Sequence, residues 1–172
     1  MIGKVIKKIG NDISTDIIYP GRFMATILPT ETPRFAFADD TVFNEMLVSG
    51  SIPSESIILA GKNFGCGSSR EQAVSAVHGH GLVIVAKGIA RIFLRNAINI
   101  GLKVVVCPDI EAEEGDVLAV QDSVVVNGST NRDYGTVPLP EAQKDIMDAG
   151  GLVNYTRAYL MNQQQKTEKG WQ

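Results

Sequence analysis

The segment 63–74, which reads NFGCGSSREQAV, holds the residues best suited to chemistry. It places Ser68, Ser69 and Arg70 directly after two glycines. A serine hydroxyl can donate or accept a proton, and the guanidinium of arginine forms a fork that matches a carboxylate. Glycines allow a ligand to approach the main chain closely. These residue types together suit the binding of a carboxylate, with a hydroxyl beside it for proton transfer.

The same motif has a purely structural interpretation, in which it only starts a helix. Ser68 stands three residues before Glu71, and this S-x-x-E spacing predicts a capping box with Ser68 as the N-cap. Gly65 and Gly67 would supply a tight turn before it. Both interpretations use one geometry, because a serine that orients the turn can still face an anion at the free N–H groups of a helix start. The pattern leaves both open.

Apolar runs on either side of the motif predict the elements that position it. Short apolar runs at 56–61, 82–87 and 103–107 predict strands, and the segments at 69–81 and 88–101 predict helices. Unbroken apolar strands that alternate with helices are typical of a parallel sheet covered on both faces. The motif follows the first of these strands, and α/β proteins bind ligands beyond the carboxyl ends of parallel strands.

The remaining segments predict a single domain over residues 1–163. In chain order we expect a strand at 3–9, a polar turn and short apolar run at 11–21, a loop at 22–38, a helix at 40–50 capped by Asp40 or Thr41 and ended by Gly50, two or three strands within 115–138, and helices within 139–163 that Gly150 and Gly151 separate. The loop is long, and such loops are usually functional or mobile. Residues 164–172 are polar and predict a frayed tail.

Composition argues against several functional classes. The 172-residue chain has a net charge of −3 and 44% hydrophobic residues, so it lacks the basic excess expected for nucleic-acid or acidic-membrane binding. No apolar run approaches the roughly 20 residues that span a bilayer. The N-terminal segment has basic residues but no apolar stretch after them, so we expect no secretory signal and a cytoplasmic protein.

The cysteine and histidine content limits the metal chemistry of this chain. Cys66 and Cys107 lie far apart and are expected to be free thiols in a reducing compartment. His78 and His80 are two residues apart and would face different ways on a helix. Two cysteines and two histidines do not suffice for a four-cysteine zinc site or an iron–sulfur cluster, so no metal site is expected in this chain.

The motif and its neighbours resemble the swivel domain of the aconitase family. The stretches NFGCGSSREQAV and AKGIARIFLRNAINIGL carry the resemblance, and NDISTDIIYPGRF and GGLVNYTRAYL extend it over most of residues 1–160. The resemblance implies a three-layer α/β fold with a mixed, partly parallel β core flanked by helices. It also implies a larger partner subunit that holds a [4Fe–4S] cluster, over which this chain closes on the substrate.

The reaction implied by the resemblance is the removal and re-addition of water on a 2-hydroxy di- or tricarboxylic acid. The position of Ser68 matches the family's base, which takes a proton from the carbon next to a carboxylate. The family's substrate-binding positions match Gly67, Ser69, Arg70 and Asp16. Cys66, between the glycines, is expected to be a small structural residue. Two further interpretations of Asp16 are open: a charge partner that orients Arg70 or Ser68, and an ordinary turn residue.

The loop that begins YPGRFMAT is implied to select the substrate, through Arg22, Phe23, Met24, Ala25 and Thr26. Homoaconitase-like relatives place an arginine near the position of Ala25. The small, apolar Ala25 favours an apolar substituent such as isopropyl, and therefore the interconversion of 2- and 3-isopropylmalate in leucine biosynthesis. Because Arg22 and Arg34 lie in the same region, homoaconitate is also a candidate substrate. Dimethylmalate is a third candidate. A non-catalytic anion-binding module is the alternative from a different class.

Overall fold

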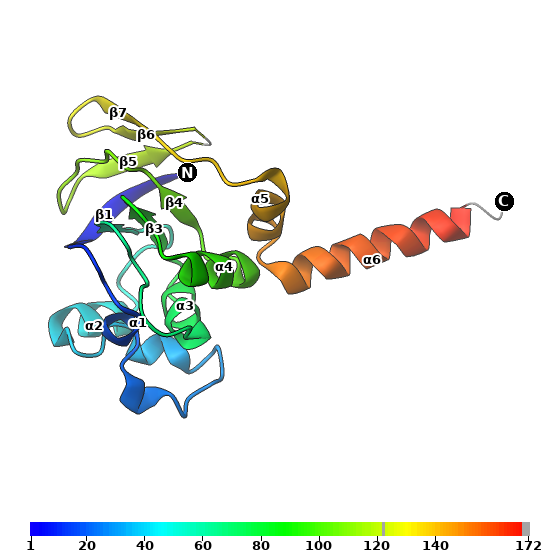
Figure 1. Cartoon of the computed structure of the whole chain (residues 1–172), viewed down its shortest axis with the longest axis horizontal. Coiled ribbons are helices and arrows are strands. Elements are labelled where there is room, and N and C mark those ends of the chain that lie inside the picture. The colour runs from blue at the N-terminus through cyan, green and yellow to red at the C-terminus, as the bar shows by residue number, and fades with distance from the viewer. Residues whose placement is uncertain (122, 170–172) are drawn as a thin grey trace.

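The computed structural model describes residues 1–121 and 123–169, and this part of the chain folds around a seven-stranded mixed sheet (Figure 1). The strands are β1 (Ile2–Ile9), β2 (Ile57–Ala60), β3 (Val83–Ala86), β4 (Val104–Val106), β5 (Val117–Val120), β6 (Val124–Asn127) and β7 (Arg132–Gly135). Their order across the sheet is β4-β3-β2-β1-β5-β6-β7. Strands β1 to β4 are parallel, and β5 to β7 continue the sheet in antiparallel fashion.

Helices cover one face of the parallel strands. The helical elements are α1 (Thr15–Ile18), α2 (Thr41–Val48), α3 (Glu71–His78), α4 (Arg91–Ile100), α5 (Glu141–Asp148) and α6 (Leu152–Lys169), with 3-10 turns η1 (Gly21–Phe23) and η2 (Thr32–Phe35). Alternate strand residues such as Ile58 and Ile84 point to this face. They pack against buried side chains of the helices, which include Ile18, Phe43, Val74, Val77, Phe93 and Ala97.

The other face is covered by the antiparallel strands and the segment that leads to them. Here Ile57 and Val85 pack with Ile110, Leu118 and Val125. In Figure 1, β5 to β7 lie at the top and α1 to α4 at the bottom, with the parallel strands between them. The layers are therefore helices, parallel strands and antiparallel strands. The prediction of an α/β fold with a mixed, partly parallel core is confirmed, and β structure rather than a second set of helices covers the second face.

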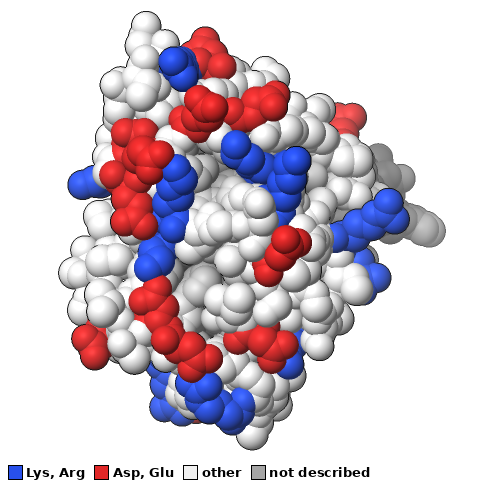
Figure 2. All heavy atoms as spheres, turned by 60° about the vertical axis from the view of Figure 1, so that its left-hand side comes forward, with Lys and Arg blue, Asp and Glu red and all other residues white. Residues whose placement is uncertain are grey.

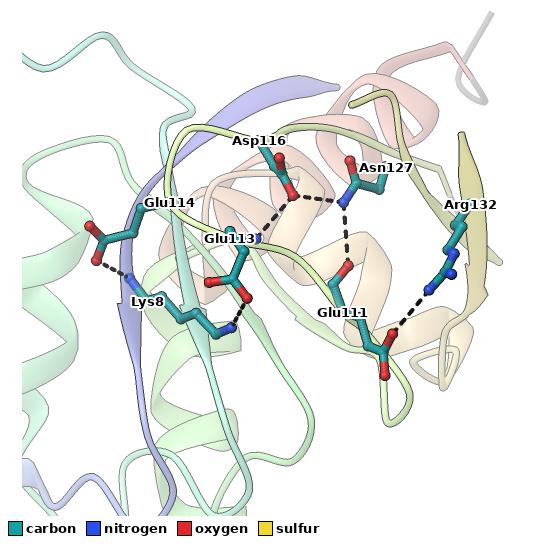
Figure 3. Close-up of polar contacts among 7 residues, drawn as sticks. All are labelled: Lys8, Glu111, Glu113, Glu114, Asp116, Asn127 and Arg132. Carbon is teal, nitrogen blue, oxygen red and sulfur yellow. Dashed lines mark hydrogen bonds and ion pairs between the residues drawn. The ribbon is translucent and has the colours of Figure 1, made fainter. Parts of the chain in front are cut away.

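A polar network fixes the segment 107–116 that covers this second face (Figure 3). The side-chain amide of the fully buried Asn127 donates to the main-chain oxygen of Glu111 (3.3 Å) and to the carboxylate of Asp116 (2.9 Å). The same carboxylate accepts from the main-chain N–H of Glu113 (3.0 Å), and these hydrogen bonds lower the pKa of Asp116. Lys8 of β1 pairs with the Glu113 carboxylate at 2.5 Å. The network therefore ties the segment to both β1 and β6.

Helix α2 starts and stops where the sequence predicts. Asp40 is the N-cap, and its carboxylate accepts from the N–H of Phe43 at 3.1 Å. Ser49 is the C-cap, and Gly50 follows it with a φ of +69°. The start of this helix was predictable from the local sequence, because the capping residue Asp40 and its hydrogen-bond donor Phe43 are three residues apart.

Two segments are more ordered than the sequence suggests. Within the expected 22–38 loop, the η2 turn packs on α3, and Thr32, Ala36 and Phe37 are buried. Only the first half therefore keeps the character of a surface loop, and its mobility stays a prediction. The break at Gly150 and Gly151 is confirmed. Helix α6 then continues to Lys169, so the expected frayed tail is helical at 164–169, and 170–172 lie outside the described residues.

Helix α6 projects away from the sheet in Figure 1. Its first turn contacts α4 and α5, and most of its described side chains are exposed. Within the described residues, neither this helix nor any other is long and apolar enough to cross a membrane.

Candidate active site

The motif is positioned by main-chain pairing beyond the ends of the parallel strands. After β2 the chain runs beside the segment that follows β1, and Asp12 N–H donates to Lys62 O while Thr15 N–H donates to Cys66 O, both at 2.8 Å. On its other side, Phe64 pairs with the segment that follows β3, since Ala90 N–H donates to Phe64 O at 2.8 Å. This pairing carries residues 66–70 past the sheet edge and places them against α1.

Gly65 is required for this path. It has a φ of +76°, and a Cβ atom at this position would lie 2.2 Å from Cγ of Phe93. Phe93 is a buried residue of α4 whose ring packs edge-on against Phe64, with centroids 5.0 Å apart. The main chain at Gly65 therefore packs directly against the core, and this contact positions residues 66–70.

Arg70 and Asp16 form the charged centre of the site. Nη1 of Arg70 donates to Oδ1 of Asp16, which stands in the first turn of α1, and also to the main-chain oxygen of Tyr19 at 3.3 Å. The Arg70 side chain is 15% exposed and the Asp16 side chain 56% exposed. Gly21 lies close by, since a Cβ atom there would be 3.6 Å from both Nη2 of Arg70 and Oδ1 of Asp16. The interpretation of Asp16 as a charge partner of Arg70 is thus favoured over that of a plain turn residue.

The prediction that Ser68 caps α3 is wrong. The helix begins at Glu71, its N-cap is Arg70 in an extended conformation, and no side chain caps it. The main-chain oxygen of Ser68 instead accepts from Oγ1 of Thr15 and from the N–H of Arg70, each at 2.9 Å. The N-cap therefore lies two residues later than the capping box predicts.

The serine hydroxyls are therefore not used for folding. Gly67, Ser68 and Ser69 are all exposed, and neither serine hydroxyl has a hydrogen-bonding partner among the described residues. Both stand next to Arg70, at the start of an eight-residue helix whose first N–H groups have no intrahelical partner. Such a surface can bind an anion and leave a hydroxyl free for proton transfer.

The five predicted specificity residues point in different directions. Phe23 and Met24 are half-buried and pack against the core. Arg22 is tied to Asp39 by a 2.5 Å ion pair, and this hydrogen bond lowers the pKa of Asp39. Ala25 is exposed, and the main-chain oxygen of Thr26 lies 3.4 Å from the hydroxyl of Tyr19. Of the five, Ala25 is exposed and offers a small apolar side chain without charge.

Two positioning residues were not singled out from the sequence. Thr15 is 1% exposed and holds the main chain at Ser68 and Cys66, and Tyr19 is fully buried and accepts from Arg70. Both belong to the STDIIYP stretch, of which only Asp16 was assigned a role. Thr15 and Tyr19 are buried because the motif pairs with their segment, and this pairing cannot be predicted from the sequence of the segment alone.

The two thiols have different environments. Cys66 is half-buried beside Ser14, whereas Cys107 is buried and donates to Gly135 O at 3.3 Å. Burial raises the pKa of Cys107 to about 11. Among the described residues, no group of three or more His, Cys, Asp or Glu side chains is placed to hold a metal ion. The donors in the described part of the chain are therefore not arranged as ligands of a [4Fe–4S] cluster.

A recess is present at the carboxyl ends of β1 to β3, and the residues that line it do not include those of the motif. It has a volume of about 360 Å³ and is lined by Lys8, Lys87, Glu111 and Glu113 among others. Three of these charges are paired, through Lys8–Glu113 and Arg132–Glu111. Figure 2 shows acidic and basic side chains interspersed on the exposed face, several of them around a hollow. The mixture of signs gives no extended basic surface there.

Comparison with known proteins finds relatives over most of this chain. Residues 36–109 match the model of the aconitase C-terminal domain. The small subunit of 3-isopropylmalate dehydratase from Methanosarcina mazei is 40% identical over 154 residues, which cover 87% of this chain and 93% of that protein. The corresponding subunit from Heliobacterium modesticaldum is 42% identical over 156 residues, covering 87% and 91%. The crystal structure of 3-isopropylmalate dehydratase from Methanocaldococcus jannaschii superimposes with a TM-score of 0.86 at 36% identity, covering 96% of this chain and 99% of that one.

The fold and the motif thus define an aconitase-type swivel domain. Within that class, the chain belongs to the family of 3-isopropylmalate dehydratase small subunits.

Proposed function

We propose that this chain is the small subunit of a two-chain hydro-lyase that interconverts 2-isopropylmalate and 3-isopropylmalate by dehydration and rehydration. The observation that carries the proposal is the free hydroxyl of Ser68 next to the Arg70–Asp16 pair, in a chain about 40% identical to small subunits of this enzyme over most of its length. The reaction is a step of leucine biosynthesis. The site faces solvent, as half of a site shared with a larger subunit would.

Ser68 is the proposed base. In the dehydration direction, a proton moves from the substrate carbon next to a carboxylate to Oγ of Ser68, as hydroxide leaves the neighbouring carbon. Rehydration then places the proton on the carbon that lost hydroxide and hydroxide on the carbon that lost the proton, which gives 3-isopropylmalate. The helix start at Glu71 and the Arg70 guanidinium both favour negative charge on this oxygen. Proton transfer to a positioned group contributes roughly 10²–10⁴-fold in rate.

Arg70 is the proposed carboxylate ligand, with Ser69 and the main chain at Gly67 beside it. The contacts of Arg70 to Asp16 and Tyr19 both use Nη1, so its remaining N–H donors point elsewhere. A guanidinium has five donors, and two of them suit a bidentate carboxylate contact. Asp16 then acts through Arg70, by fixing the plane of the guanidinium.

The departing hydroxide requires a Lewis acid that this chain does not supply. We assign it to an iron–sulfur cluster on the large subunit, whose open iron would polarise the substrate hydroxyl. The small-subunit name of the relatives supports a large subunit as the partner. The contribution of this chain is to bind the substrate carboxylate and to hold the proton acceptor.

The substrate choice is supported by the state of the two loop arginines. Arg22 is paired with Asp39, and the Arg34 guanidinium stacks on the Phe35 ring at 4.5 Å. Both are committed to contacts within this chain, and Ala25 offers no charge. A substrate with an alkyl arm therefore fits this loop better than the carboxylate arm of homoaconitate.

The test is a substrate panel on the complex of this chain with its large subunit: 2-isopropylmalate, dimethylmalate, homocitrate and citrate. We expect the highest kcat/KM for 2-isopropylmalate and no activity from this chain alone. A higher kcat/KM for homocitrate than for 2-isopropylmalate would contradict the proposed substrate and indicate the homoaconitase reaction instead. Dehydration by the isolated chain would contradict the shared site, and inactivity of the complex on the whole panel would favour a non-catalytic anion-binding module.

A further inference from the structure

Tyr19 connects the carboxylate-binding end of the site to the specificity loop. Its main-chain oxygen accepts from Nη1 of Arg70 at 3.3 Å. Its hydroxyl lies 3.1 Å from the main-chain oxygen of Phe23, to which it donates, and 3.4 Å from that of Thr26. One residue thus contacts both the arginine and two points of the loop that follows it.

Tyr19 itself is held rigidly. It is fully buried, and its N–H donates to Thr15 O at 2.8 Å. Its ring packs edge-on against Phe35 with centroids 6.2 Å apart. Tyr19 is buried, and both its N–H and its main-chain oxygen are hydrogen-bonded, so it has little freedom to move. We therefore expect its hydroxyl to restrict the position of the loop.

The loop is closed at its base by the same aromatic cluster. The Phe23 and Phe35 rings stack with centroids 4.1 Å apart at an interplanar angle of 13°, which joins η1 to η2. The guanidinium of Arg22 covers the outer face of Phe23 at 4.6 Å. Between the two rings, the side chains of Ile27 and Leu28 are 70% and 54% exposed. Beyond the stack, the N–H of Thr26 donates to Phe23 O at 2.9 Å, and the main-chain oxygen of Thr26 lies 3.4 Å from the Tyr19 hydroxyl.

We propose that Tyr19 is a positioning residue for substrate selection, whose hydroxyl fixes the segment 23–26 at a set distance from Arg70. This rests on the proposed function, in which Arg70 binds the common carboxylate and the loop meets the variable arm. A bound substrate contacts both Arg70 and the segment 23–26. The length of substituent that fits therefore depends on the distance that Tyr19 sets between them. Burial also raises the pKa of Tyr19, which keeps the phenol protonated as a donor.

The test compares Tyr19→Phe with Tyr134→Phe in the complex with the large subunit. The first variant keeps the ring and removes the hydroxyl that holds the loop. The second is a matched control, because the Tyr134 hydroxyl is buried on β7 without a hydrogen-bonding partner among the described residues. The measurements are kcat and KM for 2-isopropylmalate and dimethylmalate, and amide hydrogen exchange of residues 23–28.

For Tyr19→Phe we expect a KM for 2-isopropylmalate raised about 5-fold with kcat within about 2-fold of wild type, as the loss of one neutral hydrogen bond allows. Discrimination between the two substrates should fall by a similar factor, and exchange at 23–28 should accelerate. Tyr134→Phe should match wild type throughout. Equal KM, discrimination and exchange in the two variants would overturn the proposal, as would a fall in kcat alone.

The exchange measurement separates this proposal from the proposed function. If the wild-type complex turns over none of the panel, the proposed function fails, and the exchange rates alone then decide whether Tyr19 holds the loop. Faster exchange at 23–28 in Tyr19→Phe than in Tyr134→Phe supports the positioning role. Unchanged exchange overturns it.

Discussion

Arg70 and Asp16 are 54 positions apart in the chain, yet the guanidinium of one donates directly to the carboxylate of the other. The contact joins the first turn of α1 to the residue that caps α3. It uses a single nitrogen of Arg70, so the pair orients the guanidinium without occupying it. A charged group that is oriented but still available is what recognition of a carboxylate requires.

The first prediction concerns this pair. In Arg70→Lys the ammonium keeps the charge but loses the planar fork, so KM should rise roughly 10- to 100-fold, or 1.4 to 2.8 kcal/mol. Asp16→Asn should raise KM by a smaller factor, because the guanidinium loses its charged partner but keeps its own donors. Steady-state kinetics of the two-chain complex give both values. Because Asp16 is more than half exposed, the pair contributes at most about 1 kcal/mol to stability, and a larger loss in urea denaturation would show a structural role instead.

The second prediction separates chemistry from folding at Ser68. Ser68→Ala should lower kcat by roughly 10²–10⁴-fold, because it removes the proposed proton acceptor. The free energy of unfolding should stay within about 0.5 kcal/mol of wild type, since the hydroxyl makes no contact in the described structure.

Asp40→Ala is the matched control for this comparison. It removes an N-cap that the structure does contain, so it should cost about 1 kcal/mol of stability and leave kcat unchanged. A Ser68→Ala variant that loses stability like Asp40→Ala and keeps its turnover would show that Ser68 serves the fold only.

The contrast between Asp40 and Ser68 shows what local sequence signals can and cannot give. Both residues match a helix-cap pattern. At Asp40 nothing competes with the cap, and the prediction is confirmed. At Ser68 the main-chain oxygen accepts a hydrogen bond from Thr15, 53 positions away, and the N-cap lies at Arg70 instead, so the predicted cap does not form. Strands were predictable because their apolar runs report burial directly, whereas this pairing of two loops leaves no periodic signal in the sequence.

The 22–38 segment shows the same limit. Its prolines and mixed polarity predict a loop, but Ala36 and Phe37 are buried beside α2 and α3 in the core. Tertiary packing overrode local composition there. The assignment of chemistry to the motif came from the family resemblance, since the residue types alone left the capping interpretation open. The contacts of Thr15 and Tyr19 required the structure.

The third prediction is that Gly65→Ala destabilises the fold severely. The new methyl group would lie 2.2 Å from a ring atom of Phe93 at a φ of +76°, so overpacking and backbone strain add. We expect a loss of about 3–5 kcal/mol in urea denaturation. Gly115→Ala is the control, because its φ is +98° and no atom lies within 4 Å of the added carbon. It should cost only about 1 kcal/mol, and similar losses in the two variants would rule out the Phe93 contact as the cause.

The fourth prediction concerns acid stability at Asp40. Its pKa is lowered first by the hydrogen bond to Lys7 and next by the N–H of Phe43. A carboxylate whose pKa is lower when folded stabilises the protein above its unfolded pKa of about 3.9, and this contribution disappears as the pH falls through the folded pKa. In Asp40→Asn the cap is kept and the charge is lost. Wild type should therefore exceed the variant by at most about 1 kcal/mol at pH 7, and the two should converge below about pH 4. A constant difference over this range would contradict the assignment.

The fifth prediction uses the difference between the two thiols. At pH 8 the half-buried Cys66 should react with a disulfide reagent in the folded protein, whereas Cys107 should react only on unfolding. Burial raises the pKa of Cys107 to about 11, against about 8.5 in an unfolded chain, so the folded state holds its proton more tightly. Its stabilising effect is complete below pH 8.5 and is lost as the pH rises toward 11. Wild-type stability in urea should decline between pH 8.5 and 10.5, and Cys107→Ala should decline less, although its cavity lowers its stability at every pH. Cys66→Ala should keep the wild-type slope. If Cys107→Ala kept that slope as well, the alkaline loss would belong to other groups, and the thiol would have to be charged or accessible in the folded protein.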